Sequence, residues 1–150
     1  MKVGQYLGPN QVRTGFEAKG KPEAIRLLLR MMTDAGMLAA EKVPEVTQAI
    51  LEREALTSTG LGYGLALPHT RTDLVGKIQA VFARSEKGVE FESLDGNPVR
   101  FLFLVLAPWR RTEEYLKLVS SISSLMKNEN VRRRLLEARS KDEILRILGE

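Results

Sequence analysis

His69 is the only histidine of the chain, and it closes the segment TGLGYGLALPH. A neutral imidazole is a good nucleophile near pH 7 and can carry a transferred group as a covalent intermediate. Arg53 and Arg71 flank the segment with positive charge, which disfavours protonation of the ring and stabilises phosphoryl oxygens. These residue types predict a nucleophilic histidine in an oxyanion or phosphate pocket, while a histidine after a proline is also compatible with a structural role.

The glycines before His69 are suited to shape that pocket. A glycine-rich loop presents backbone N–H groups to an anion, and neighbouring hydroxyl groups add further donors. The candidate phosphate-binding residues are Ser58, Thr59, Gly62, Gly64 and Arg71. The glycine spacing G-x-G-x-G is not the G-x-G-x-x-G of dinucleotide sites, and the Gly-Lys-Ser/Thr of a P-loop is missing. A plain flexible turn is the alternative to an anion cradle.

Composition limits the class of protein. With 150 residues, 43% hydrophobic and 28% charged, the chain has material for one core, and we expect a single domain over residues 1–150. The chain has no cysteine and one histidine, which excludes a disulfide framework and a multi-histidine zinc site and fits a reducing compartment.

Charge and hydropathy restrict the surroundings in which the chain works. A formal charge of +4 permits an acidic partner or weak nucleic-acid binding without identifying either. The N-terminus lacks the apolar core of a signal peptide, and the densest apolar run, Phe101 to Trp109, is too short to span a bilayer. We therefore expect a soluble cytoplasmic protein without membrane insertion.

Hydrophobic periodicity predicts the elements that hold the histidine. The expected helices cover Pro22–Gly36, Pro44–Leu56, Thr112–Lys127, a segment restarting at Asn128, and a last one begun by the capping box Ser140–Glu143. The expected strands are a short edge strand within residues 10–17, Leu65–Leu67 ending at Pro68, Ile78–Ala83, Val89–Phe91 after a turn, and Val99–Leu106. The last strand is almost wholly apolar, as in a central strand covered on both faces. The pattern predicts an α/β fold in which helices flank both faces of a sheet.

The segment Ile50–Arg71, ILEREALTSTGLGYGLALPHTR, resembles the phosphorylation-site signature of a known family. This family is the type-2 enzyme IIA domains of the bacterial phosphoenolpyruvate-dependent sugar phosphotransferase system, the fructose, mannitol and nitrogen-regulatory group. The match joins a helix-borne Arg-Glu, a Ser-Thr-Gly, alternating glycines and a Pro-His, and the likeness extends over almost the whole chain. It implies a mixed sheet flanked by helices, with His69 as phosphoryl acceptor and Arg53 stabilising the phosphoryl charge.

The resemblance also implies partners. The donor would be a histidine-containing phosphocarrier protein, and the recipient a IIB domain or a regulatory target protein, with no cofactor or metal. Because the chain ends at Glu150 without a membrane segment or attached IIB domain, a nitrogen-regulatory role is favoured over a sugar-specific one. The alternative function is a non-catalytic IIA-like regulatory module that binds a partner protein without phosphate.

One position departs from the family pattern. Many members carry a second histidine in the segment after the central strand, where this chain has Tyr115. A phenol can donate a hydrogen bond to a phosphoryl oxygen, but it cannot replace imidazole as a proton acceptor near neutral pH. The departure therefore bears on onward transfer more than on acceptance by His69.

Other charged residues allow two interpretations each. For Trp109–Arg111, the functional interpretation is that these residues line the same pocket or contact a partner. The structural interpretation is an ordinary exposed loop. Arg132–Arg134 is a solvated helix face in preference to a nucleic-acid patch, because three consecutive helical residues point in different directions. Asp73 and Glu54 are candidates to orient His69, although surface ion pairs are the favoured interpretation.

Overall fold

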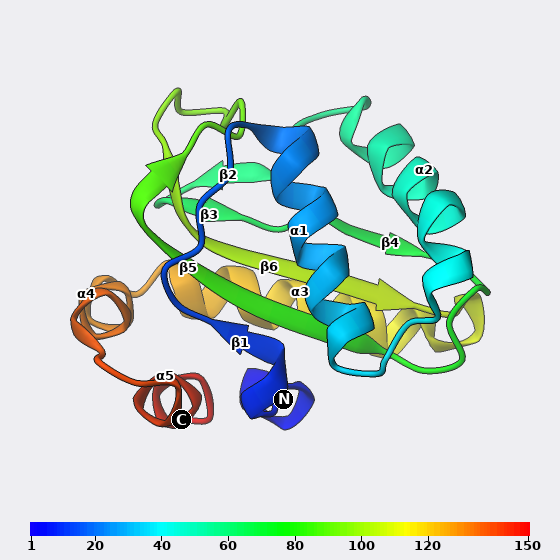
Figure 1. Cartoon of the computed structure of the whole chain (residues 1–150). Helices are drawn as coiled ribbons and strands as arrows, with labels where there is room; N and C mark the ends of the chain where they lie inside the picture. The colour runs from blue at the N-terminus through cyan, green and yellow to red at the C-terminus, as the bar shows by residue number, and fades with distance from the viewer.

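The computed structural model describes residues 1–150 and places six strands between five α-helices (Figure 1). The helices are α1 (Lys21–Asp34), α2 (Val43–Glu54), α3 (Thr112–Met126), α4 (Glu129–Glu137) and α5 (Lys141–Leu148). The strands are β1 (Val12–Arg13), β2 (Gly60–Gly62), β3 (Leu65–Ala66), β4 (His69–Arg71), β5 (Gln79–Val89) and β6 (Val99–Ala107). Short 3₁₀ turns lie at Val3–Tyr6, Pro9–Gln11, Ala40–Lys42 and Trp109–Arg111. No helix is both long and apolar enough to cross a bilayer.

The strands form one mixed sheet in the order β1-β5-β6-β3-β2, and β4 also pairs with β6. The central strands β5 and β6 are antiparallel, whereas β1 runs parallel to β5, and both β3 and β4 run parallel to β6. Strands β3 and β4 follow one another along the same side of β6, as Figure 1 shows. The predicted mixed sheet and the edge strand at Val12 are confirmed.

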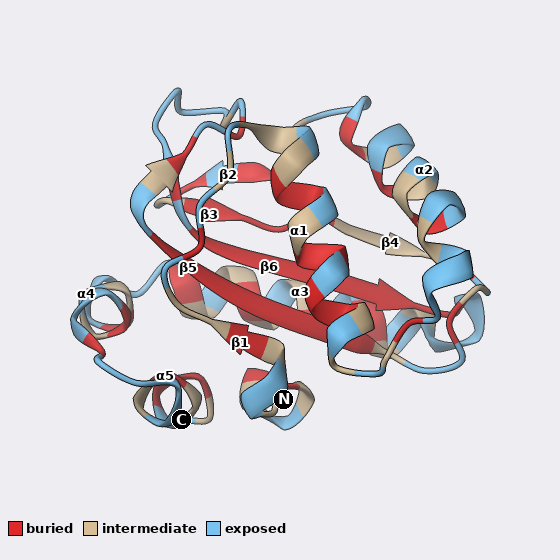
Figure 2. Cartoon of the chain, in the orientation of Figure 1, coloured by how far each residue is buried: buried red, intermediate tan, exposed pale blue.

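Helices cover both faces of the sheet, as predicted. Helices α1 and α2 pack on one face, while α3, α4 and α5 pack on the other (Figure 1). The two apolar clusters contain 20 and 21 buried residues, so both faces of the central strands are covered about equally. Figure 2 accordingly shows β5 and β6 as buried along most of their length. This double burial explains why Val99–Leu106 lacks polar alternation.

The last two helices begin where they were predicted to begin, after Asn128 and after Ser140. Asn128 accepts hydrogen bonds from the backbone N–H groups of Asn130 and Val131, and the Ser140 hydroxyl accepts one from the N–H of Glu143. The reciprocal half of the predicted box differs, because the Glu143 carboxylate accepts from the N–H of Arg139, one residue before the cap, at 2.9 Å.

The strands differ from the predictions in three places. The predicted strand Leu65–Leu67 is present as β3 and ends before Pro68, but a further strand, β4, follows it along β6. Proline cannot donate to the ladder, and its carbonyl accepts from the N–H of Val105 at 3.1 Å. The strand β2 at Gly60–Gly62 was not predicted, and it forms a hairpin with β3. Ile78–Ala83 and Val89–Phe91 are not two strands, because β5 runs unbroken through Val89 with a bulge that absorbs the expected turn.

Candidate functional site

Strand β4 positions His69 at an edge of the sheet. Its register places His69 opposite Val105 of β6, and the β2–β3 hairpin covers only the preceding part of this side of β6. The side chain is half-buried and faces α3, where its ring centroid lies 5.9 Å from that of Tyr115. The imidazole is thus held against the helix layer and still reachable from solvent.

A backbone hydrogen bond fixes the tautomer of the imidazole. The Nδ1 atom of His69 lies 2.5 Å from the carbonyl oxygen of Leu67, which can only accept. Nδ1 therefore carries the proton, and the lone pair of the neutral ring is on Nε2. Burial lowers the pKa of His69 below its ordinary 6.5, the bond to Leu67 opposes this, and the nearby Arg53 charge lowers the pKa further while Glu54 raises it. The neutral, nucleophilic ring is the dominant form at pH 7.

Tyr115 forms the buried floor beside the histidine. Its side chain is 5% exposed, and its phenol oxygen has no hydrogen-bond partner in the protein. Gln79 Oε1 is the only side-chain nitrogen or oxygen that is both shielded from solvent and without a hydrogen-bond partner. The Tyr115 hydroxyl also has no partner, so it is not fully shielded and retains contact with solvent. Burial raises the pKa of Tyr115 to about 12, against the opposing charges of Arg71 and Arg53. The phenol is therefore a hydrogen-bond donor over the whole physiological range of pH.

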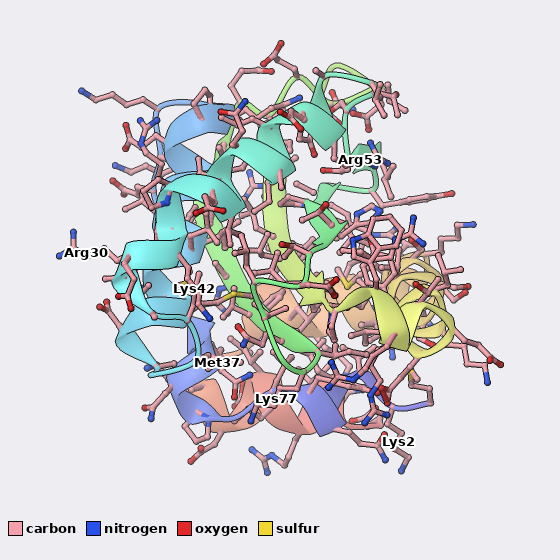
Figure 3. All side chains as sticks on the ribbon, turned by 90° about the vertical axis from the view of Figure 1, so that its right-hand side faces the viewer. Lys2, Arg30, Met37, Lys42, Arg53 and Lys77 are labelled. Atoms are coloured by element: carbon pink, nitrogen blue, oxygen red, sulfur yellow. The ribbon has the colours of Figure 1, made fainter.

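Arg71 and Arg53 bring positive charge to the surroundings of Tyr115, and neither arginine forms an ion pair with a carboxylate. The Arg71 guanidinium carbon lies 4.2 Å from the ring centroid of Trp109 and 5.7 Å from that of Tyr115. One long hydrogen bond of 3.5 Å joins Arg71 to the Thr112 hydroxyl. Arg53 lies in the last turn of α2 (Figure 3), and its Nη1 donates to the carbonyl oxygen of Thr57 at 3.2 Å. Most N–H donors of both arginines are thus available to an anion.

The other predicted phosphate-binding residues lie elsewhere. Thr59 is fully buried and donates its hydroxyl to Glu54, while Ser58 accepts from Lys21 Nζ at 3.3 Å. Gly62 and Gly64 have φ values of 95° and 72° and form the turn of the β2–β3 hairpin. Along β6 this turn is near Phe101 and His69 is near Val105, about 13 Å away at the rise of a strand. The structure therefore does not bring the hairpin glycines to His69.

Two carboxylates that sequence reasoning assigned to surface ion pairs have other partners. Glu54 is 6% exposed and forms an ion pair of 3.0 Å with Lys21, which is itself largely covered. Asp73 accepts the backbone N–H of Trp109 at 3.0 Å. The buried Lys21–Glu54 pair joins residues 33 positions apart, so no local sequence pattern predicted it. Neither Glu54 nor Asp73 forms a hydrogen bond with His69.

The three consecutive arginines of α4 do not form one patch. Arg132 stacks on Tyr63 at 4.9 Å, Arg133 hydrogen-bonds Asn130, and Arg134 pairs with both carboxylate oxygens of Glu150 at 2.7 and 2.6 Å. The preferred interpretation of a solvated helix face, with each side chain bound to its own surroundings, agrees with this arrangement.

Comparisons with known proteins give the same family that the histidine segment resembles. Residues 5–150 match the family described as "Phosphoenolpyruvate-dependent sugar phosphotransferase system, EIIA 2". The fructose-specific EIIA component of Haloferax volcanii is 38% identical over 130 residues, which are 87% of this chain and 83% of that relative.

Solved structures agree. The nitrogen regulatory protein IIA-Ntr from Neisseria meningitidis has a TM-score of 0.88 and 28% identity, covering 97% of this chain and 98% of that one. The mannitol IIA of Escherichia coli, solved in complex with phosphorylated IIB, has a TM-score of 0.79 and 32% identity over 95% of this chain and 96% of that one. From the sequence match over nearly its full length, the chain belongs to the EIIA type-2 family of the phosphoenolpyruvate-dependent sugar phosphotransferase system.

Proposed function

We propose that this IIA protein is a phosphocarrier that accepts a phosphoryl group on Nε2 of His69. The observation that carries the proposal is the state of the ring. Its Nδ1 donates to the Leu67 carbonyl, its pKa is lowered, and the lone pair is left on Nε2. The charge of Arg53 acts on the ring, and both the ring and Arg71 lie beside Tyr115. A structural histidine would not require two neighbouring arginines that form no ion pair with a carboxylate.

The transfer needs no proton movement in this geometry. The Nε2 lone pair forms a bond to phosphorus while the P–N bond of the donor's phosphoimidazole breaks, and its electron pair returns to the donor nitrogen. His69 keeps its Nδ1 proton, and the resulting positive charge on the ring is stabilised by the Leu67 carbonyl. The reaction is then a matter of alignment and charge stabilisation, without a required metal or cofactor.

Three side chains complete the proposed site. Arg53 and Arg71 stabilise the phosphoryl oxygens, because their guanidinium groups keep donors free. Tyr115 donates a hydrogen bond from the buried side of the ring. We leave Ser58, Thr59, Gly62 and Gly64 out of this site, since their contacts lie in the Glu54 network and in the hairpin turn.

The proposed donor is a histidine-containing phosphocarrier protein, and the proposed recipient a IIB domain or a regulatory target. The complex of the mannitol IIA with phosphorylated IIB supports a IIB recipient. Trp109, which stacks on Arg71 and is 54% exposed, offers an aromatic anchor at the rim of the site. We place this exchange in the cytoplasm. The relatives include fructose-specific and nitrogen-regulatory proteins, so the IIB domain and the regulatory target are both candidate recipients.

Intact-mass measurement at mildly alkaline pH tests the proposal. The protein is incubated with phosphoenolpyruvate, enzyme I and the phosphocarrier protein, and compared with His69→Ala. We expect one acid-labile phosphoryl group on the wild type and none on the variant. If active donors modify neither protein, the phosphocarrier function is refuted, and the alternative, a module that binds its partner without phosphate, takes its place.

A further inference from the structure

A chain of hydrogen bonds joins the start of α1 to the ring of His69. Lys21 Nζ donates to Glu54 at 3.0 Å, and the Glu54 carboxylate accepts both the hydroxyl and the backbone N–H of Thr59, the latter at 3.2 and 3.3 Å. The Thr59 carbonyl accepts the N–H of Leu67 at 2.9 Å. The Leu67 carbonyl in turn accepts the Nδ1 proton of His69. Four segments of the chain are thus linked in one path that ends on the imidazole.

The first part of this path is buried. The side chains of Lys21 and Glu54 are only 11% and 3% exposed, and Thr59 is completely covered. A carboxylate taken out of water is costly unless it is paired and hydrogen-bonded, and here it has one cation and two donors of one residue as partners. Loss of any partner would leave a buried charge uncompensated, so the arrangement holds Thr59 in one place.

The second part controls where the Leu67 carbonyl lies. Leu67 stands between β3 and β4, just before Pro68, which has no N–H and cannot donate to β6. The hydrogen bond from the N–H of Leu67 to the Thr59 carbonyl therefore holds the backbone in place where the pairing with β6 is interrupted. Which ring nitrogen of a histidine keeps the proton is set by the hydrogen bond that the other nitrogen makes. Displacing the Leu67 carbonyl would release both the tautomer and the orientation of the ring.

We propose that Glu54 is a positioning residue for the phosphoryl acceptor. Held by Lys21, it fixes Thr59 and, through the Thr59–Leu67 bond, keeps His69 in the Nδ1–H tautomer with the lone pair on Nε2. Glu54 does not touch the phosphoryl group, and its significance for transfer rests on the proposed function of His69. Because Glu54 directly follows Arg53 in α2, the same network also fixes the helix end that carries this arginine.

The single histidine allows a direct test by ¹⁵N NMR of the ring, since every imidazole signal belongs to His69. The variants are Glu54→Gln, Thr59→Val and Thr59→Ser, and the matched control is Glu52→Gln, an exposed neighbour whose carboxylate accepts only from Gln48. We expect the wild type, Glu52→Gln and Thr59→Ser to show the Nδ1–H tautomer at pH 8. Glu54→Gln and Thr59→Val are expected to show a mixture of both tautomers.

The rate of phosphoryl acceptance is measured on the same proteins. Misplacement of a reacting group by about 1 Å costs on the order of 100-fold, so we expect a loss of about 10- to 100-fold for Glu54→Gln and Thr59→Val. Thr59→Ser, which restores the hydroxyl, should recover most of the rate. Thermal unfolding identifies variants that do not fold; should Glu54→Gln be one of them, the comparison of Thr59→Val with Thr59→Ser decides.

The two proposals fail in different ways. If folded Glu54→Gln and Thr59→Val keep the ring signals of the wild type, the positioning role is overturned, whatever the phosphorylation result. If the signals shift but the wild type accepts no phosphoryl group from active donors, the positioning of the ring stands and the phosphocarrier function falls.

Discussion

Tyr115→Phe separates the role of the buried phenol in the site from its role in the fold. The substitution keeps the ring beside His69 and removes only the hydroxyl, which has no partner in the protein and touches solvent. Its removal should change the free energy of unfolding by less than about 1 kcal/mol, because no protein hydrogen bond is broken. In the phosphorylated state the same hydroxyl would donate to a phosphoryl oxygen, and that bond is lost.

The expected functional loss follows from the strength of such a bond. A hydrogen bond to a charged group contributes about 1.5–3 kcal/mol, and about 1.4 kcal/mol is a factor of ten, so acceptance should slow by about 10- to 150-fold. The assays are intact mass against time and denaturant unfolding, with Tyr63→Phe at the exposed hairpin turn as matched control. An unchanged rate would remove Tyr115 from the site. A loss of more than about 2 kcal/mol in stability would show that its hydroxyl serves the fold.

Three further predictions test charge and packing. Because the pKa of His69 is lowered, the rate of acceptance should be constant above pH 6.5 and fall only as pH approaches the folded pKa. The contribution of the neutral ring to the free energy of unfolding is complete above pH 6.5 and is lost as pH falls toward the folded pKa, and an NMR titration of the single histidine checks that pKa. Arg53→Gln should raise the pKa of His69 and slow acceptance by at least about tenfold, and the same titration and intact-mass assay would contradict this if neither changed. Gly60→Ala places a methyl carbon 2.8 Å from Ser93 Cα and should cost about 1–3 kcal/mol in denaturant unfolding, whereas Gly76→Ala meets nothing within 4 Å and should cost less than about 0.5 kcal/mol.

The elements with a clear period were predictable from sequence, and the contacts between distant segments were not. Helices α1 and α3 and the strand Val99–Ala107 have strong apolar patterns, so their positions followed directly. Glycines at alternate positions fit a loop and a hairpin equally well, and only the register against β6 shows that their turn is remote from His69. Local pattern could not distinguish these cases.

The candidate site divides in the same way. Residue chemistry made His69 and its flanking arginines candidates but left a structural role for the histidine open, and the resemblance to the family favoured the phosphoryl acceptor. The Lys21–Glu54 pair joins residues 33 positions apart, and its burial follows from the packing of α1 against α2. A charged residue in an amphipathic helix is normally assigned to the surface. The error on Glu54 was therefore an error about burial, which depends on tertiary packing.

In the proposed mechanism, the tyrosine in place of a second histidine does not prevent onward transfer. A second imidazole would matter if a proton had to be taken up during transfer, whereas in that mechanism His69 keeps its Nδ1 proton before and after the P–N bond forms. Transfer to a IIB domain or regulatory target would be the reverse of acceptance, with the same arginines holding the phosphoryl oxygens. Burial raises the pKa of Tyr115 to about 12, so the phenol beside the ring does not titrate near neutrality. Onward transfer should consequently proceed with a rate that is constant from pH 7 to pH 9, and a rate that rises with pH in that range would show that a proton acceptor on this protein is required.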